Sequence, residues 1–235
     1  MIDDEKVGAV IVAAGSSTRM QGVDKTMALL GEKPLLAHTL DVFQQSDYVD
    51  HIVLVLSKDG IKQGRPFAEE YGFSKVSDIC EGGQLRADSV TAGLERIGDC
   101  SWVIIHDGAR PCLSEQLIEQ GLREASETGA AIAAMPVKDT VKLVGPNGMI
   151  SGTPSRGHLW MAQTPQVFLR DVIVKAYSSR NRNATDDAEL VEALGYKVKI
   201  YEGSYDNIKV TTQVDLDIAE SVLRRMRRVA LHKKQ

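Results

Sequence analysis

The sequence predicts a three-layer α/β fold, in which a mostly parallel central sheet is covered by helices on both faces and a β-arm protrudes. Short apolar runs alternate along the chain with amphipathic stretches, which is typical of parallel sheets with helical crossovers. The chain has 235 residues, enough to bury one substantial core. We therefore expect residues 1–235 to form a single domain.

The individual elements follow from hydrophobic periodicity. The predicted strands cover residues 7–13, 51–57, 101–106 and 130–136. The predicted helices cover about 34–45, 60–71, 84–97, 114–128, 169–179, 186–194 and 213–229. Ligands of such sheets bind beyond the carboxyl ends of the strands, so Gly15 and Asp107, which follow two predicted strands, mark candidate sites.

Residues 137–160 break this alternation. Val137–Val144 alternates apolar and polar residues, and Gly145-Pro146-Asn147-Gly148 supplies the chemistry of a turn. A two-stranded hairpin is marginally stable alone in water. We therefore expect this arm either to fold back on the domain or to pack on a second subunit.

Composition limits the partners and the compartment. A formal net charge of -4 and a pI near 5.8 give no basic field for nucleic acid, and aromatic residues make up only 5% of the chain. No apolar run is long enough to predict a membrane span. Cys80, Cys100 and Cys112 lack metal-binding spacing, which favours free thiols in a reducing, cytoplasmic setting.

The stretch Val10–Met20 is the first candidate site. An apolar run ends at Gly15, hydroxyl residues follow, and Arg19 and Lys25 supply positive charge. Backbone N–H groups of such a turn can bind a phosphate, and arginine can pair bidentately with its oxygens. The glycine pattern of dinucleotide-binding loops and the Gly-Lys-Ser/Thr of the Walker loop are both absent. An ordinary strand-to-helix turn with a solvated arginine is the alternative.

Three more polar positions follow apolar runs. Asp107 is placed as a ligand for Mg²⁺, which prefers one or two carboxylates plus phosphate oxygens; capping of the next turn is the alternative. The Glu81–Ser89 segment is interpreted as a strand end, a turn and a helix start, with glycine N–H groups that can contact a base; a plain turn with a capped helix is the alternative. Asn207–Thr211 is interpreted as a strand end that carries Lys209. An ordinary solvated lysine at a strand end is the alternative interpretation of Lys209.

Seven segments resemble the 2-C-methyl-D-erythritol 4-phosphate cytidylyltransferase family, which has a nucleotide-sugar-type nucleotidyltransferase fold. They are AAGSSTRM, GGQLRADSV, HDGARPC, DTVK, SRGHLWMAQTPQVF, ATDDAELVEALG and NIKVTT, and together they extend from residue 13 to residue 212. The ordered set TPQ-F, TDDA and NIKVT is far more specific than the glycine loop.

This resemblance implies an enzyme that transfers CMP from CTP to 2-C-methyl-D-erythritol 4-phosphate and releases pyrophosphate, in isoprenoid precursor synthesis by the non-mevalonate route. It also implies Mg²⁺ or another divalent cation at Asp107, and a homodimer joined by the 137–160 arm. The implied catalytic residues are Arg19, Lys25 and Lys209. The implied nucleotide-binding residues are Ala13, Ala14, Gly15, Gly83, Arg86 and Ser89. The implied acceptor-binding residues are Arg110, Thr140, Arg156 and Thr185.

The chain departs from the family pattern at two places. The spacer between Arg19 and Lys25 is shorter by about one residue, with Asp24 in place of a proline and Thr26 in place of a glutamine. Gln84 stands where the family often has an acidic residue.

The implied reaction suits the residues present. A phosphate monoester is mostly dianionic at neutral pH, because its second pKa is about 6, so the attacking group needs no general base. Neither a Ser-His-Asp nor a Cys-His pattern is present, and His106 is interpreted as a structural neighbour of Asp107. Cations and Mg²⁺ that neutralise growing charge are what this chemistry requires.

Other functions remain open from sequence. A cytidylyltransferase for ribitol 5-phosphate or another polyol phosphate would use the same loop and cations. A nucleotide-binding regulator without turnover is the alternative from a different class. An NAD-dependent oxidoreductase is disfavoured by the missing glycines.

Overall fold

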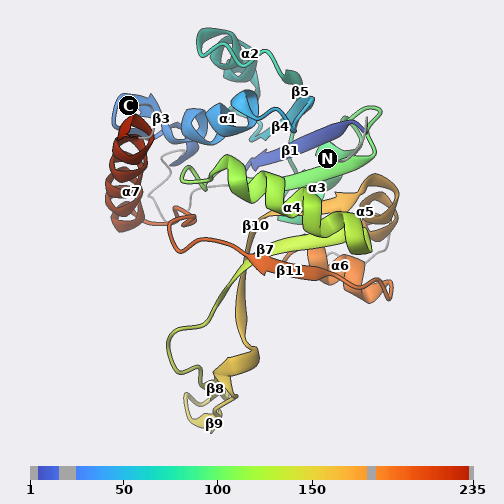
Figure 1. Cartoon of the computed structure of the whole chain (residues 1–235), viewed down its shortest axis with the longest axis vertical. Coiled ribbons are helices and arrows are strands. Elements are labelled where there is room, and N and C mark those ends of the chain that lie inside the picture. Colours follow the sequence, from blue (N-terminus) through green and yellow to red (C-terminus); the bar gives the residue numbers. More distant parts are fainter. Residues whose placement is uncertain (1–4, 16–24, 179–183, 233–235) are drawn as a thin grey trace.

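The computed structural model describes residues 5–15, 25–178 and 184–232, and it has the predicted α/β fold (Figure 1). The main sheet has seven strands, and only β10 runs antiparallel to its neighbours. In spatial order the strands are β11 (Lys199–Glu202), β7 (Ala130–Pro136), β10 (Trp160–Leu169), β6 (Trp102–Asp107), β1 (Val7–Ala13), β4 (His51–Leu56) and β5 (Val76–Glu81).

Helices cover both faces of this sheet, as predicted. One face packs against α1 (Leu35–Gln45), α2 (Ile61–Glu70) and α4 (Glu115–Thr128). The opposite face packs against α3 (Arg86–Leu94), α5 (Arg170–Tyr177) and α6 (Asp187–Ala193). Because both faces are covered, the central strands β1 and β6 are almost wholly buried, which explains their continuous apolar sequences.

A third cluster surrounds α7 (Gln213–His232). This helix buries Leu216, Ala219 and Val222 against a group that includes Leu30 and Leu35. Leu30 belongs to a small ribbon of β2 (Leu29–Leu30) and β3 (Lys33–Pro34) that follows the short 3-10 helix η2 (Lys25–Met27). No helix in the described part of the chain has both the length and the apolar character needed to cross a bilayer.

Close packing of α3 on the sheet depends on a glycine. A Cβ atom at Gly93 would lie 2.4 Å from Val10 Cγ1, so a larger residue would push the helix away from β1. The N-terminus of α3 carries pocket residues, and its distance from β1 therefore fixes the width of the site described below.

The sequence-based element assignments are confirmed for most of the fold and incomplete for three strands of the main sheet. All four predicted strands and all seven predicted helices are present, with small shifts at their ends. The strand end predicted at Glu81 is the end of β5, but the range of β5 was not predicted, nor were β10 and β11, because their sequences mix exposed polar residues with short apolar stretches. The prediction that Asn207–Thr211 ends a strand is wrong: this segment is a loop, held to the domain by Val210 N–H donating to Ala109 O over 2.8 Å.

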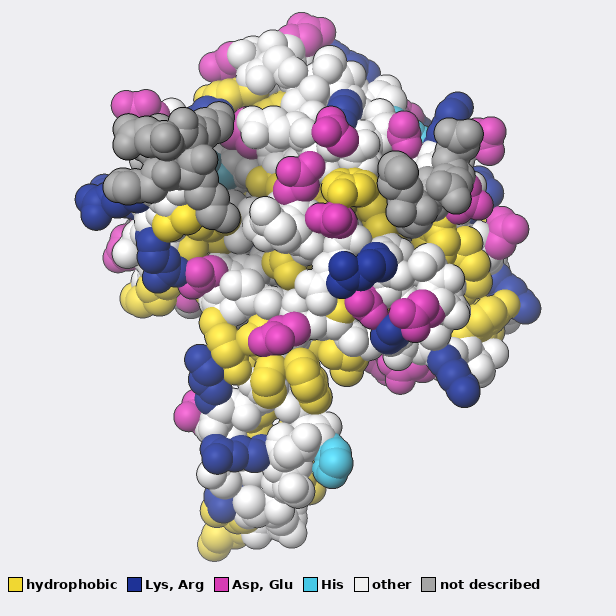
Figure 2. Space-filling model, in the orientation of Figure 1, with side chains coloured by type: hydrophobic (Ala, Val, Ile, Leu, Met, Phe, Trp, Pro, Cys, Tyr) yellow, Lys and Arg dark blue, Asp and Glu magenta, His cyan; other side chains and the backbone are white. Residues whose placement is uncertain are grey.

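The segment between β7 and β10 extends away from the body of the molecule in Figure 1. It contains an antiparallel pair, β8 (Leu143–Val144) and β9 (Ile150–Gly152), and the short 3-10 helix η3 (Arg156–His158). Figure 2 shows hydrophobic side chains at the base of this projection and at its tip. Leu143, Met149 and Ile150 are among the exposed large hydrophobic residues of the arm.

Candidate active site

A pocket of about 390 Å³ opens at the carboxyl ends of β1 and β6. In the main sheet the strand that follows β1 in sequence, β4, pairs with one edge of β1, and β6 pairs with the other edge. The strand order therefore changes direction between β1 and β6. Residue Val12 of β1 pairs in register with Asp107 of β6. The turn after β1 and the carboxylate that ends β6 therefore face the same cavity. Open sheets bind ligands at such a switch point.

The wall opposite Asp107 is the turn between β5 and α3. Gly82 N–H donates to Leu56 O over 2.8 Å, which holds this turn against the end of β4. A Cβ atom at Gly82 would lie 2.3 Å from Ala14 Cβ and 2.6 Å from Ser89 Oγ. Only glycine allows the turn to approach the end of β1 so closely. Gly83, Arg86 and Ser89 follow in the pocket wall.

Asp107 is the electrostatic centre of the pocket. Lys209 Nζ lies 2.9 Å from its Oδ2, Arg110 Nε lies 3.4 Å from the same oxygen, and Arg86 Nε lies 3.3 Å from Oδ1. Burial alone would raise the pKa of Asp107, but the three cations outweigh it and hold this pKa well below its usual range. Asp107 is therefore a carboxylate at every physiological pH.

His106 precedes Asp107 in β6 and is fully buried. Its Nδ1 lies 3.0 Å from Thr164 Oγ1, its Nε2 lies 3.3 Å from Arg110 O, and Asp107 N–H donates to the same Thr164 oxygen. Burial lowers the pKa of His106 to about 3, so the ring is neutral. The contacts then fit one tautomer, in which Nε2–H donates to Arg110 O and Nδ1 accepts from Thr164. His106 is a structural residue, as interpreted from the sequence.

The loop that carries Lys209 is tied to the same residues. Arg110 Nη1 donates to Asn207 O over 2.8 Å, and Asn207 Nδ2 donates to Thr164 O over 2.7 Å. An ion pair between Asp206 and Arg225 of α7, 2.5 Å long, holds the start of this loop from outside. Lys209 thus reaches Asp107 from a loop that is fixed at several points.

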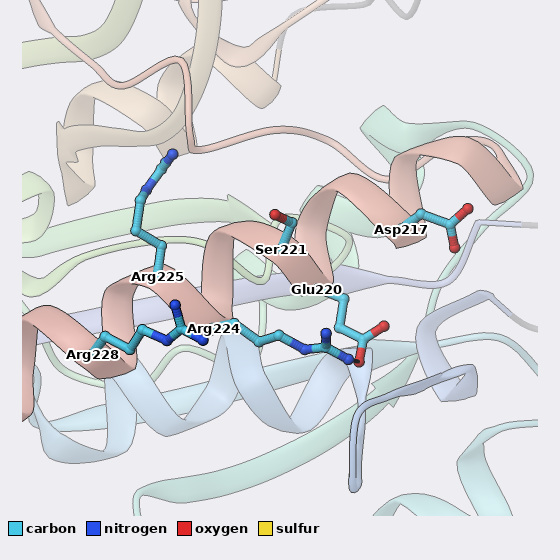
Figure 3. Close-up of a pocket in the computed structure, with 6 residues that line it drawn as sticks. All are labelled: Asp217, Glu220, Ser221, Arg224, Arg225 and Arg228. Carbon is cyan, nitrogen blue, oxygen red and sulfur yellow. Dashed lines mark hydrogen bonds and ion pairs between the residues drawn. The ribbon is translucent and has the colours of Figure 1, made fainter.

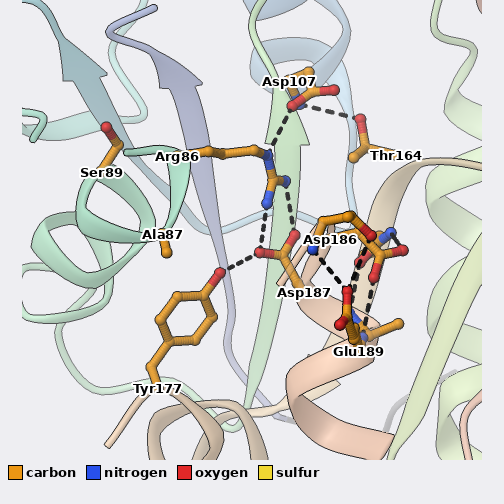
Figure 4. A network of polar contacts seen from close by, with 12 residues as sticks. Arg86, Ala87, Ser89, Asp107, Thr164, Tyr177, Asp186, Asp187 and Glu189 are labelled. Carbon is orange, nitrogen blue, oxygen red and sulfur yellow. Dashed lines mark hydrogen bonds and ion pairs between the residues drawn. The ribbon is translucent and has the colours of Figure 1, made fainter. Parts of the chain in front are cut away.

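Arg86 joins Asp107 to α6 (Figure 4). Its Nη1 and Nη2 each lie 2.7 Å from one carboxylate oxygen of Asp187, a bidentate pair, and the Tyr177 hydroxyl donates to Asp187 Oδ1. Burial alone would lower the pKa of the Arg86 guanidinium, but Asp187 and Asp107 outweigh it and raise this pKa. Arg86 is therefore a permanent cation in the pocket wall.

The structure brings most of the predicted site residues together. The pocket is lined by Ala13, Ala14, Gly15, Gly83, Arg86, Ser89, Asp107 and Lys209. Arg110 is buried behind Asp107, whereas Thr140 and Arg156 lie on the arm. Thr185 is next to the N-terminus of α6, where its hydroxyl and N–H both donate to Glu189. Arg19 and the side chain of Lys25 lie outside the described residues.

Residues 7–225 match the model of the family described as IspD: 2-C-methyl-D-erythritol 4-phosphate cytidylyltransferase. The chain belongs to this family.

Relatives and solved structures of the family cover nearly the whole chain. A 2-C-methyl-D-erythritol 4-phosphate cytidylyltransferase of Dehalococcoides mccartyi is 54% identical over 97% of this chain and 100% of its own length. One of Alkaliphilus oremlandii is 46% identical over 94% of this chain and 97% of its own. The crystal structure of 4-diphosphocytidyl-2C-methyl-D-erythritol synthase from Anaerococcus prevotii matches with a TM-score of 0.82 at 32% identity, over 95% of this chain and 98% of that one.

The sequence alone did not assign three of the polar residues behind this cytidylyltransferase-family pocket. Asp187 and Tyr177 fix Arg86, and Thr164 links His106 to Asp107. Asp187 and Thr164 lie within segments that carry the family resemblance, but their partners are distant in sequence: Arg86 precedes Asp187 by 101 residues. A pairing across that distance follows only from the three-dimensional fold, in which α5 packs against both α3 and α6.

The donor set fits a metal that is held largely by its substrate. Within the described residues there is no group of three or more histidine, cysteine, aspartate or glutamate side chains that would form a protein cage for an ion. Among the described residues that line the pocket, Asp107 is the one that presents a permanent carboxylate. Mg²⁺ commonly takes one or two protein carboxylates and fills its other positions with water and substrate phosphates.

A second hollow lies along α7 (Figure 3). It is lined by Asp217, Glu220, Ser221, Arg224, Arg225 and Arg228. Arg224 pairs with Glu220 and Arg225 pairs with Asp206, so both side chains are used within the domain. The residues that line this hollow are not among those of the pocket at Asp107.

The glycine wall of the pocket can be tested by substitution. Gly82→Ala should destabilise the protein by about 1–3 kcal/mol, because the added methyl group overlaps Ala14 and Ser89. Urea denaturation measures this change. Gly157→Ala is the matched control: its Cβ would lie 3.8 Å from Ser155 Oγ, and its effect should stay within about 0.5 kcal/mol. Equal stability of Gly82→Ala and the parent protein would contradict the close approach.

Proposed function

We propose that this chain transfers CMP from CTP to 2-C-methyl-D-erythritol 4-phosphate, as a step of isoprenoid precursor synthesis by the non-mevalonate route. The observation that carries the proposal is the set of three cations around Asp107 at the switch point of the sheet. Relatives that align over their full length and bear the name of this activity support it. An oxygen of the acceptor phosphate attacks the α-phosphorus of CTP, the bond to the β-phosphate oxygen breaks, and pyrophosphate leaves.

The nucleotide would lie across the pocket, with its base and ribose at the Gly82–Ser89 turn and its phosphates toward Gly15. This orientation is supported by Gly83, which leaves room for a base in the pocket wall, and by Lys209, which lines the same pocket and offers a positive charge to a phosphate. Permanent cations that are already fixed in place stabilise charge as it moves from the attacking oxygen to the leaving pyrophosphate. Arg19 and Lys25 would add two more cations to the phosphate end.

Proton transfer from the acceptor is not required. The acceptor phosphate is mostly dianionic at neutral pH. His106, which adjoins the site, is neutral, fully buried and engaged through both ring nitrogens. The side chains of this site therefore act by position and charge.

We further propose that Mg²⁺ or another divalent cation assists the reaction with Asp107 as its protein ligand. Bound to the triphosphate, such an ion would neutralise charge on the leaving group. Asp107 supports this proposal because it is the acidic residue among the described residues that line the pocket, and its carboxyl group is ionised.

We also propose a homodimer whose arms complete the acceptor site. Thr140 and Arg156, which the family resemblance assigns to the acceptor, lie on the arm and do not line the pocket of their own chain. The arm carries several exposed hydrophobic side chains, and a two-stranded ribbon gains stability by covering them.

Cys80, Cys100 and Cys112 are buried free thiols, which supports a cytoplasmic location.

Pyrophosphate release measured with CTP and a panel of polyol phosphates tests the proposed activity. Methylerythritol 4-phosphate should give the highest kcat/KM. A clear preference for ribitol 5-phosphate would change the acceptor and keep the cytidylyl transfer. Binding of CTP without release of pyrophosphate from any acceptor would favour a regulator and overturn the enzymatic proposal.

Lys209→Ala should lower kcat about 100- to 1000-fold, because it removes one fixed positive charge at the reacting phosphate. Lys33→Ala is a matched control. Lys33 also pairs with an aspartate, and its side chain is also 39% exposed, but it lies outside the pocket. Steady-state kinetics should show parental rates for Lys33→Ala. Parental rates for Lys209→Ala would exclude a role for this lysine in the chemistry.

Ile150→Asp should convert the dimer to inactive monomers. The side chain is 62% exposed in the single chain, so the aspartate costs little there, whereas covering it in an interface would bury an unpaired charge. Sedimentation velocity measures the assembly state. Leu29→Asp, at a site that is 69% exposed outside the arm, should remain dimeric. A fully active monomer, whether wild type or Ile150→Asp, would contradict both the arm interface and the shared acceptor site.

A further inference from the structure

Asp187 is a fully buried carboxylate that lies behind the pocket wall. Its side chain is 0% exposed, and the side chain of its partner Arg86 is 28% exposed because it lines the pocket. The two groups form a bidentate pair, in which both carboxylate oxygens accept from the guanidinium over 2.7 Å. Bidentate pairs fix the plane of a guanidinium as well as its distance. The orientation of Arg86 in the pocket is therefore set from behind.

The pair of Arg86 and Asp187 also contacts the pocket on one side and the core helix α5 on the other (Figure 4). Arg86 Nε reaches Asp107 Oδ1 over 3.3 Å, and the hydroxyl of Tyr177 on α5 donates to Asp187 Oδ1. Asp187 is the first residue of α6, and α6 packs against α5 and β7. One carboxylate thus connects two core helices to a side chain that lines the pocket.

We propose that Asp187 is a positioning residue for nucleotide binding, acting through Arg86, and that Tyr177 holds Asp187 in the orientation this requires. The proposal rests on the proposed use of CTP, and it adds two residues outside the pocket lining to the determinants of its affinity. Three of the five N–H donors of Arg86 are used in the described contacts with the two aspartates. The other donors remain for a ligand in the pocket.

Charge explains why a carboxylate is needed behind Arg86. An arginine paired only with Asp107 would be drawn onto that carboxylate, which already accepts from Lys209 and Arg110. Asp187 provides a second and geometrically better partner, because both of its distances to Arg86 are shorter than the one from Asp107. Arg86 is therefore held at the wall of the pocket, with only one N–H directed to Asp107.

The test measures CTP binding by calorimetry without acceptor, and then steady-state kinetics. Asp187→Asn keeps the shape of the side chain and removes its charge. It should raise the Kd and the KM for CTP about ten- to a hundredfold, the loss expected for a charge-assisted bidentate contact. The KM for the acceptor should stay within about twofold, and kcat should fall less than the KM rises. Tyr177→Phe should shift the Kd in the same direction by a smaller factor.

A double-mutant comparison separates positioning from a purely structural role. Arg86→Lys keeps the charge and loses the fork geometry, so Asp187→Asn made in that background should change the Kd for CTP less than about twofold. Equal effects of Asp187→Asn in both backgrounds would overturn the proposal. Asp186→Ala is the neighbouring control. It removes the side chain that accepts from Glu189 N–H and caps α6, so it should lower the melting temperature without changing CTP binding.

A crystal structure of Asp187→Asn tests the positioning role of Asp187 without any assumption about the substrate. The Arg86 guanidinium should leave the position seen here, and an unchanged Arg86 would overturn the positioning role whatever the enzyme binds. Failure of the wild-type protein to bind CTP would instead reject the proposed function, and the crystallographic comparison would still decide the role of Asp187.

Discussion

The site depends on one buried carboxylate that is surrounded by cations. Asp107 is 6% exposed, and three cations lie within 3.4 Å of its oxygens, from α3, from the turn after β6 and from the loop before α7. An ionised group at such depth is stable only when it is paired and hydrogen-bonded. Each pairing also fixes a different segment of the chain, so Asp107 orients the positive charges that a polyphosphate would meet.

The topology of the sheet explains why these segments converge. Strands β1 and β6 are neighbours, and the chain leaves them in opposite directions across the sheet, which opens a crevice beyond their ends. Gly82 and Gly93 then bring the turn after β5 and the helix α3 against β1 at distances that no side chain would permit. Backbone geometry provides the cavity, and the ion pairs determine which charges face it. In the contacts described here, three cations and the carboxylates of Asp107 and Asp187 leave one net positive charge at the pocket.

Much of this arrangement was predictable, because burial leaves a strong pattern in the sequence. The parallel strands β1, β4, β6 and β7 are mostly apolar because both of their faces are covered, so they and the carboxyl-end positions of Gly15 and Asp107 were recognisable. Strand β10 is also central, but its buried Thr164 and Gln166 interrupt the apolar pattern. Strands β5 and β11 lie at the edges of the sheet and alternate less clearly. The loop at Lys209 was mistaken for a strand end, because Ile208 and Val210 are apolar for another reason: both pack in the cluster around α7.

Pairings between distant segments are harder to predict from sequence than the positions of single residues. Asp107 could be assigned to a candidate site from its position at a strand end, and Lys209 through the family resemblance, whereas the link from Asp187 to Arg86 crosses 101 residues and leaves no periodic signal. The presence of Asp187 also has a local explanation, since the helix dipole favours an acidic residue in the first turn of a helix. That explanation is incomplete, because a residue serving only the dipole gains nothing from complete burial. Its burial against an arginine of the pocket indicates that the start of α6 is organised around the ligand site as well as around the helix.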